Sequence, residues 1–389
     1  MTEFVQPDYQ GAGLINLISS IRLASGDPSS AHPPLAGLPL EPLQQAQHLV
    51  LLVIDGLGYD FLQRQQGSFL QRHCQQSLTS VFPTTTSAAI TSVMSGLAPA
   101  QHALTGWFMY LQELGAVTAI LPFTSRCGNV SFQRQGIDIS QVVDATGYYS
   151  RLDRHVYVVS EQRLLNSPFS NCFTADVNNL GYDNLAGCFK QLNKVLAQDS
   201  RTFSYVYWAQ LDHDGHVYGM NSPQTQQHFA ELDAALEALA DSLAGSDACV
   251  LITADHGLVD TELTQVIHLE QHPELQAMLS HPLCGEPRAA YCYLKPGREA
   301  AFEAYVQTHL QEFCEARPSR ELVQQGYFGP GEIHPKLLDR IGDYTLLMKS
   351  NYVIKDRLLG EKAFNQRGVH GGLSRQEVYI PLICLTGSG

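Results

Sequence analysis

The sequence predicts an α/β fold in which a central, mostly parallel sheet is sandwiched by helices. Three apolar runs are continuous enough to be strands covered on both faces, which is typical of parallel sheets. Amphipathic stretches lie between these runs, and strands that alternate with helices favour this fold class. The 389 residues are expected to form one domain, 1–389, with a smaller inserted cap or α+β subdomain at about 262–345.

The first strand is predicted at 48–54, where the run HLVLLVI ends at Asp55. A helical stretch at about 58–73 follows this strand. A turn at Pro83 then leads into a second, short helix, which Gly96 is placed to end. The apolar face of that helix is expected to carry Ala89, Ile90, Val93 and Met94.

Two more strands are predicted from similar runs. One covers 204–211 and ends at Asp212, and the other covers 249–254 and ends at Asp255. The segment 222–243 between them is a long amphipathic helix, because its apolar residues recur with helical spacing. Ligands of such folds bind beyond the carboxyl ends of the strands, so both aspartates fall where a site is expected.

The remaining segments give weaker patterns. The first 45 residues are rich in Pro, Gly and Ser and are expected to wrap the surface, while 110–200 is expected to form part of a lid or cap. Within the expected insert at 262–345, a strand is predicted at 288–294 and a helix at 298–313.

The composition limits the partners of this protein. A formal net charge of −14 argues against nucleic-acid polymers, whose phosphate backbone would be repelled. No signal peptide is evident, and no run approaches the roughly 18 apolar residues of a membrane helix. The nine cysteines show no paired spacing, so we expect reduced thiols in a cytoplasmic protein without membrane contact. The oligomeric state is not predicted.

Six dispersed carboxylates and imidazoles are candidates for one site. Each follows an apolar run or lies in a glycine-marked turn, and three aspartates with three histidines suit two divalent cations. Mixed nitrogen and oxygen ligands favour Zn²⁺, Mn²⁺ or iron over Ca²⁺. The six candidate metal ligands are Asp55, Asp212, His216, Asp255, His256 and His370.

Local spacing supports this set. Asp212 and His216 are four residues apart, so one turn of chain can direct both at one ion, with His213 and Asp214 as candidates to orient His216. The glycines around His370 permit a tight ligand loop. Each fragment alone is also typical of a structural or surface position, and a purely structural metal protein is the alternative from another functional class. Structural sites are usually closed by four ligands, however, whereas six ligands shared by two cations leave three for each.

A hydroxyl beside such ligands is a candidate nucleophile. The run Pro83-Thr84-Thr85-Thr86-Ser87 opens the predicted short helix, where free N–H groups and the helix dipole favour an alkoxide or phosphate. A threonine needs activation by a metal or a base to attack phosphorus. Taken by itself, the run is more typical of a helix cap, and the candidate metal ligands in the same chain favour the nucleophile instead.

These residues together resemble the alkaline phosphatase superfamily, in particular its nucleotide pyrophosphatase/phosphodiesterase branch. The resemblance rests on six short motifs that occur in the family's order. They are VIDG at 53–56, FPTTT at 82–86, SGLAPAQH at 95–102, DHDGH at 212–216, TADHG at 253–257 and VHGG at 369–372.

The resemblance implies an alkaline-phosphatase-like catalytic domain with two zinc ions, or manganese as the alternative. It assigns one ion to Asp212, His216 and His370, and the other to Asp55, Asp255 and His256. It also implies that Thr86, the third residue after the proline, is the nucleophile that forms a phosphothreonine intermediate. The implied activity is hydrolysis of phosphodiester or pyrophosphate bonds in a nucleotide-type small molecule.

One position departs from the family pattern. The branch usually has an asparagine, which binds a phosphate oxygen, where this chain has Trp107. Thr105 or the Thr86 N–H is then expected to hold that oxygen, and Trp107 to line the leaving-group pocket. A phosphomonoesterase, which requires a cation such as Arg126 or Arg288 beside the phosphate, and a phosphosugar mutase are the alternative activities. A sulfatase is disfavoured because its signature is absent.

Overall fold

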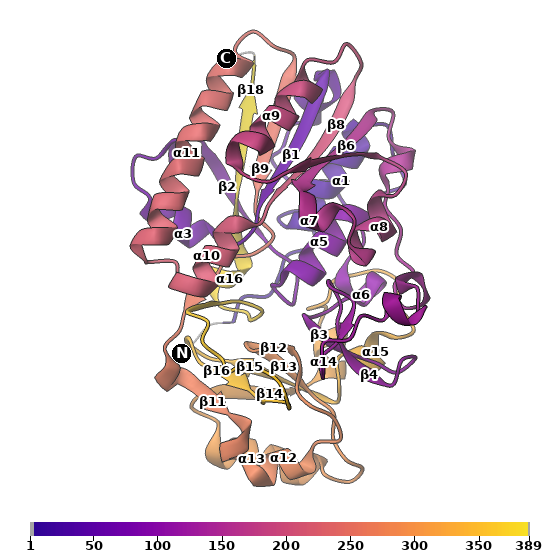
Figure 1. Cartoon of the computed structure of the whole chain (residues 1–389), viewed down its shortest axis with the longest axis vertical. Helices are drawn as coiled ribbons and strands as arrows, with labels where there is room; N and C mark the ends of the chain where they lie inside the picture. The colour runs from indigo at the N-terminus through magenta and orange to yellow at the C-terminus, as the bar shows by residue number, and fades with distance from the viewer. Residues whose placement is uncertain (1–3, 388–389) are drawn as a thin grey trace.

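The computed structural model describes residues 4–387 and contains a main sheet of seven strands in the order β2-β18-β9-β1-β8-β6-β7. Strands β9, β1, β8, β6 and β7 are parallel, whereas β18 runs antiparallel to its neighbours β9 and β2. The predicted mostly parallel sheet is therefore confirmed (Figure 1). The strand bounds are β1 His48–Ile54, β2 Cys74–Thr79, β6 His155–Glu161, β7 Asn178–Tyr182, β8 Thr202–Trp208, β9 Ala248–Thr253 and β18 Tyr379–Thr386.

The central strands end at one edge of the sheet. β1 pairs with β8 so that Ile54 faces Trp208, and with β9 so that Val53 faces Thr253. All residues of these three strands are buried, as expected for strands covered on both faces. This register brings the segments that follow the strands, including Asp55, together at the carboxyl edge.

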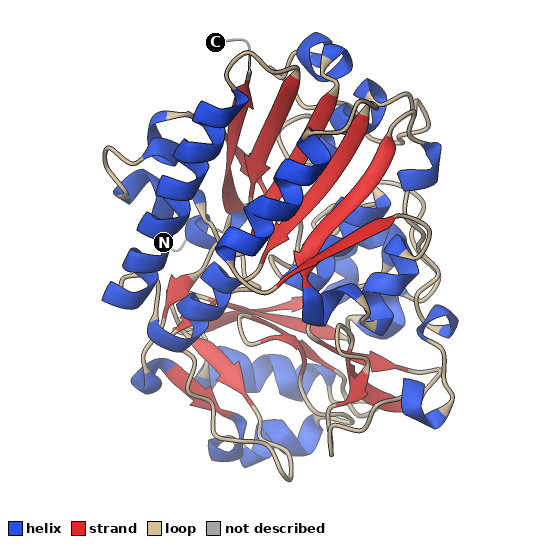
Figure 2. Ribbon diagram, turned by 45° about the horizontal axis from the view of Figure 1, so that its top comes forward, coloured by secondary structure: helices blue, strands red, loops and turns tan. Residues whose placement is uncertain are grey.

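Helices cover both faces of the main sheet (Figures 1 and 2). In Figure 1, α9 and α11 lie in front of the strands, and α1 and α5 lie behind them. The helices of this part are α1 Leu14–Ala24, α2 Leu40–Gln45, α3 Tyr59–Arg64, α4 Phe69–Arg72, α5 Thr86–Ser95, α6 Pro99–His102, α7 Gln162–Leu165, α8 Pro168–Thr174, α9 Leu185–Leu196, α10 Gln210–Tyr218, α11 Pro223–Leu243 and α16 Arg375–Val378.

Several predicted boundaries change for identifiable reasons. The helical stretch at 58–73 is two short helices, because the chain turns at Gly67, whose φ of +78° suits glycine. The strand expected to reach residue 211 ends at Trp208, since α10 begins two residues later. The helix predicted to end at Gly96 does so, with Gly96 in the left-handed conformation.

One larger prediction was wrong in part, and another stays a prediction. Between residues 4 and 45 the chain does not simply wrap the surface, because α1 is almost wholly buried in the core of the main sheet. The segment 110–200, expected to form part of a lid or cap, also supplies β6, β7 and α9 to the main layers. In both segments, the average composition gave no sign of the helices and strands that pack into the main layers.

A second sheet of seven short strands lies below the main sheet in Figures 1 and 2. Its order is β14-β15-β13-β12-β3-β4-β5, and all its pairings are antiparallel. The strand bounds are β3 Phe108–Leu111, β4 Ala116–Ala119, β5 Thr124–Ser125, β12 Cys284–Glu286, β13 Ala289–Cys292, β14 Cys314–Pro318 and β15 Tyr344–Met348. Three strands thus come from 108–125, far from the predicted insert. The boundary of that insert stays a prediction.

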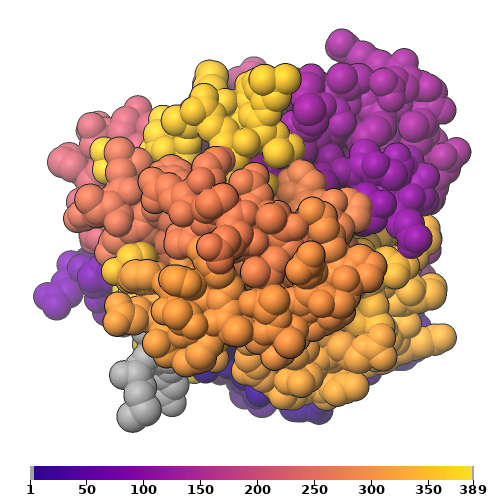
Figure 3. Space-filling model, turned by 90° about the horizontal axis from the view of Figure 1, so that it is seen from below, coloured from indigo at the N-terminus to yellow at the C-terminus, as the bar shows by residue number. Residues whose placement is uncertain are grey.

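The rest of this lower part comes from the later segments. Figure 3 shows the lower face covered mainly by orange residues of about 265–345, with the purple and yellow segments beside them. Its helices are α12 Pro273–Met278, α13 Glu299–His309, α14 Ser319–Gln324 and α15 Leu337–Arg340. Two small sheets pair β10 Val259–Asp260 with β17 Gly368–Val369, and β11 Val266–His268 with β16 Val353–Lys355. Between residues 4 and 387, no helix has both the length and the apolar character needed to cross a bilayer.

Candidate metal centre and nucleophile

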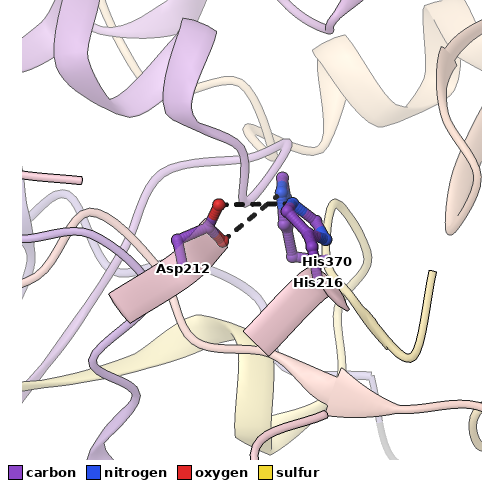
Figure 4. A group of neighbouring side chains, drawn as sticks. All are labelled: Asp212, His216 and His370. Carbon is purple, nitrogen blue, oxygen red and sulfur yellow. Dashed lines mark ion pairs between the residues drawn. The ribbon is translucent and has the colours of Figure 1, made fainter. Parts of the chain in front are cut away.

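The first predicted ligand group comes together at the carboxyl edge of the main sheet. Asp212 and His216 lie one turn apart on α10, and His370 reaches them from the loop after β17 (Figure 4). Asp212 lies 3.3 Å from the Nε2 atom of His216 and 4.0 Å from that of His370. One ligand atom from each residue lies within 4.8 Å of the other two, which is compact enough to hold one ion.

The second group adjoins the first. Asp55 follows β1, Asp255 and His256 follow β9, and their ligand atoms also lie within 4.8 Å of one another. The Nε2 atom of His256 is 3.5 Å from a carboxylate oxygen of each aspartate. The ring of His256 stacks on that of His370, with 3.9 Å between centroids, so the two groups form one continuous centre.

Each of the three imidazoles is oriented by a backbone carbonyl. The Nδ1 atom lies 2.8 Å from the Gly368 oxygen in His216, 3.2 Å from the Gly257 oxygen in His256, and 3.0 Å from the Thr84 oxygen in His370. A carbonyl can only accept, so this network assigns the proton to Nδ1. The Nε2 lone pair is then free for a cation, as in metal sites whose histidines donate their other N–H to a second partner.

The buried carboxylates fit divalent cations. One oxygen of each aspartate, Asp55, Asp212 and Asp255, is buried and has no hydrogen-bond partner within residues 4–387. Burial and the nearby charges of Asp255 and Asp212 hold the pKa of Asp55 well above its usual range. Burial also raises the pKa of Asp255. Repulsion among desolvated carboxylates is what bound cations relieve, so the donor set suits two divalent metal ions.

The imidazole of His370 is suited to a metal because its surroundings keep it neutral. Burial, together with the neighbouring His256 and His216, holds the pKa of His370 well below its usual value. The neutral form is the one that coordinates a cation, so this environment keeps His370 competent as a ligand at neutral pH.

The threonine run divides into three separate roles. The Thr84 hydroxyl donates to the Gly372 carbonyl at 2.8 Å and accepts from the Gly371 N–H, which ties the run to the His370 loop. The Thr85 hydroxyl donates to Glu286 at 2.6 Å. Both of these hydroxyls are buried and engaged.

Thr86 is the member of the run that faces the centre. Its Oγ1 atom lies 3.3 Å from Nε2 of His256 and 3.5 Å from a carboxylate oxygen of Asp55. It is the first residue of the ten-residue helix α5, where the helix dipole favours negative charge. All seven residues singled out in the sequence therefore meet at one edge of the sheet.

Two further residues, one at the centre and one beside it, were not identified from the sequence. The hydroxyl of Tyr207, on β8, donates to the Asp55 carboxylate. The buried carboxylate of Glu286, on β12, accepts from the Thr85 hydroxyl and from the Trp107 N–H, each at 2.6 Å. Tyr207 lies five residues before Asp212 on an apolar strand, and Glu286 belongs to the other sheet. Neither residue has a local pattern that marks it as part of a site.

A cavity of about 650 Å³ opens onto the centre. Thr86 and Trp107 line it, and Trp107 is 41% exposed. One side of the cavity is largely apolar and is lined by Ile90, Met94, Leu121, Pro122, Val158, Leu164, Leu165 and Phe169. The structure does not bring Thr105 to this cavity, because its side chain is fully buried behind the wall and is not among the lining residues.

The expected orienting contact within the DHDGH motif is absent from the described residues. Asp214 accepts hydrogen bonds from His228 at 2.8 Å and from Gln210 at 2.9 Å, and His216 is oriented by the Gly368 carbonyl instead. Asp214 follows Asp212 by two residues on a helix, so its side chain points to a different face. His213 lines the cavity without a bond to His216.

Comparison with known proteins identifies relatives of this arrangement. Residues 49–373 match the model of the family described as type I phosphodiesterase / nucleotide pyrophosphatase. No curated protein matches the chain by sequence.

Solved structures share the fold at low identity. Murine ectonucleotide pyrophosphatase / phosphodiesterase 5 is 17% identical with a TM-score of 0.63, over 86% of this chain and 87% of that one. An inactive variant of the murine protein in complex with AMP gives a TM-score of 0.64 at 17% identity, over 87% and 88% of the two chains. Phosphonoacetate hydrolase from Sinorhizobium meliloti, in complex with phosphonoformate, is also 17% identical, with a TM-score of 0.60 over 88% and 91%.

Proposed function

The chain belongs to the type I phosphodiesterase / nucleotide pyrophosphatase family, and from that premise we propose that it hydrolyses phosphodiester or pyrophosphate bonds of nucleotide-type small molecules. The proposed nucleophile is Thr86, and the proposed intermediate is a phosphothreonine. One observation carries this proposal: the Thr86 hydroxyl lies 3.3 Å from His256 and 3.5 Å from Asp55, on the wall of a cavity that is also lined by Asp212, His216 and His370.

The reaction proceeds in two displacements at phosphorus. In the first, the Thr86 Oγ1 atom forms a bond to phosphorus, the bond from phosphorus to the leaving oxygen breaks, and the proton of the Thr86 hydroxyl passes by way of solvent to the leaving oxygen. In the second, a water oxygen bonds to phosphorus, the bond to Oγ1 breaks, and a proton of that water passes to Oγ1. In-line geometry requires that nucleophile and leaving oxygen lie on opposite sides of phosphorus, so the leaving group would extend from Thr86 into the cavity that this residue lines.

The two ligand groups would hold divalent cations, one in Asp212, His216 and His370 and the other in Asp55, Asp255 and His256. Bound cations would lower the pKa of the attacking hydroxyl and offset the charge of the leaving oxygen. Imidazole and carboxylate donors favour Zn²⁺, with Mn²⁺ as the alternative. The protein's own contribution is orientation, because carbonyl groups fix the three imidazoles and Tyr207 fixes Asp55.

Diester or anhydride substrates are favoured over monoesters because both arginines that the sequence offered for a monoester are paired elsewhere, which leaves Arg163 and Lys355 as the Arg and Lys residues that line the cavity. The guanidinium of Arg288 is fully buried and pairs with Glu377 at 2.9 Å. Arg126 pairs with Asp356 at 2.7 Å and with Glu361 at 2.8 Å. Neither arginine lines the cavity, so neither is placed to bind the extra negative charge of a phosphomonoester. The murine relative solved with AMP supports a nucleotide-type substrate.

The decisive experiment combines one variant with a substrate panel. Thr86→Ala is expected to retain both metals, measured by inductively coupled plasma mass spectrometry, and to lose nearly all turnover. Thr86→Ser is the matched control, because it keeps a hydroxyl at the same position. Full activity in the metal-loaded Thr86→Ala protein would contradict the covalent route.

The panel tests the substrate class. The metal-loaded enzyme is assayed with bis-p-nitrophenyl phosphate, p-nitrophenyl phosphate and a nucleoside-monophosphate p-nitrophenyl ester. We expect the nucleoside ester to give the highest kcat/KM, because the cavity offers apolar surface beside the phosphorus site. A strong preference for the monoester would overturn the proposed diesterase activity.

A further inference from the structure

Lys355 is a cation on the wall of the cavity that the proposed reaction does not use. It is the last residue of β16, and it lines both the 650 Å³ cavity and a neighbouring cavity of about 950 Å³. Its Nζ atom lies 5.4 Å from the centre of the Phe108 ring and 5.9 Å from that of Phe364. The ammonium group is therefore held between two aromatic faces at the junction of the cavities.

The charge of Lys355 has no ionic partner among residues 4–387. Two nearby acids, Asp356 and Glu361, are bound by Arg126. A third, Glu286, is occupied by the Thr85 hydroxyl and the Trp107 N–H. Burial, with the nearby Arg126, holds the pKa of Lys355 below its usual value. Such a desolvated ammonium is stabilised by any anion that enters the cavity.

The position of Lys355 connects it to the reaction centre. Glu286 bridges the two, because it interacts electrostatically with Lys355 and binds Thr85, the neighbour of Thr86. Phe108, which contacts the ammonium, directly follows Trp107 on the cavity wall. A substrate bound at Thr86 and extending along this wall would bring its substituent towards Lys355.

We propose that Lys355 binds a second anionic group of the substrate, a phosphate or carboxylate attached through a short bridge to the scissile phosphorus. The inference rests on the proposed function and narrows it to substrates of the pyrophosphate type. A diester with two uncharged substituents leaves the ammonium unmatched, whereas a nucleoside diphosphate supplies the missing charge. A hydrogen bond to a charged group typically changes affinity by about ten- to a hundredfold.

The test compares two nucleotide substrates in four proteins. ADP carries a second phosphate, and a nucleoside-monophosphate p-nitrophenyl ester does not. In Lys355→Gln, the ratio of kcat/KM for ADP to that for the ester is expected to fall about ten- to a hundredfold. Lys355→Arg is expected to keep more of the ratio than Gln. Lys362→Gln is the matched control, because this exposed lysine lines only the neighbouring cavity and should leave the ratio unchanged.

Three outcomes would overturn the proposal. They are an unchanged ratio in Lys355→Gln, an equal fall in Lys362→Gln, and, when p-nitrophenyl phosphate is assayed beside the two nucleotides, a loss confined to that monoester, which would place the charge on the scissile phosphorus itself. Competitive inhibition by methylenediphosphonate and by phosphonoacetate distinguishes a phosphate from a carboxylate as the bound anion. A wild-type enzyme that cleaves neither nucleotide would contradict the proposed function, and calorimetric binding of these two inhibitors would still test Lys355.

Discussion

The buried ion pair behind the His370 loop gives the sharpest prediction about stability. Arg288, next to β13, and Glu377, on α16, are both fully buried and form two hydrogen bonds of 3.0 and 2.9 Å. Glu377 also accepts the Gly372 N–H at 2.8 Å and bonds Ser374. Burial acts to raise the pKa of Glu377, but Arg288 and these hydrogen bonds outweigh it and hold the pKa below its usual value. The pair thus joins the second sheet to the loop that carries His370.

Glu377→Ala removes one partner and leaves a buried guanidinium without its counterion. We expect the free energy of unfolding to fall by about 3–5 kcal/mol, the typical cost of breaking a buried pair. The exposed pair of Arg375 and Asp60 is the matched control, because the Arg375 side chain is 59% exposed. Arg375→Ala is expected to cost less than about 1 kcal/mol.

The assay is urea unfolding followed by tryptophan fluorescence, with metal content measured on the folded variants. Replacing both partners, as in Arg288→Met with Glu377→Leu, is expected to cost less than Glu377→Ala alone, since no unpaired charge remains buried. Loss of metal from the group that contains His370 should accompany the single substitution. A cost below about 1 kcal/mol for Glu377→Ala, or a double variant as unstable as the sum of the singles, would refute the reasoning.

Two other substitutions test a contact at the centre and a buried histidine of α6. Tyr207→Phe removes the hydroxyl that binds Asp55. The affinity for the metal of the group that contains Asp55, measured by competition with a chelator, should therefore fall about tenfold or more. Unchanged affinity would show that this hydrogen bond does not support metal binding. Burial lowers the pKa of His102 to about 3. The unfolded state therefore binds a proton first as pH falls below about 6.5, and stability should drop by about 2 kcal/mol between pH 7 and pH 5. In unfolding titrations, the loss of stability between pH 7 and pH 5 should be about 2 kcal/mol smaller in His102→Gln than in the wild type. An equal loss in the two proteins would contradict the attribution of this pH dependence to His102.

The main sheet and the candidate ligands were predictable because their signals are local. A strand buried on both faces is a continuous apolar run, and β1 and β9 fall within one residue of their predicted bounds. The parallel fold then requires that residues following such strands share an edge, which is why Asp55 and Asp255 meet. Helix α1 was missed because the Pro, Gly and Ser content of the first 45 residues as a whole concealed it. Its polar residues Asn16, Ser19 and Ser20 share one helix face, but tertiary packing buries that face as well.

The sequence by itself determined the fold class, the two sets of metal-ligand residue types and the threonine run, because these depend on hydrophobic periodicity and on side chains adjacent to strand ends. The family resemblance pointed to Thr86, and only the tertiary structure supplies the physical reason, since Thr84 and Thr85 are engaged by partners about 200 or more residues away in the chain. It also decided that Arg126 and Arg288 are paired inside the protein, while Lys355 on the cavity wall forms no ion pair within residues 4–387. Such distinctions depend on contacts between segments distant in sequence, and no local pattern encodes them.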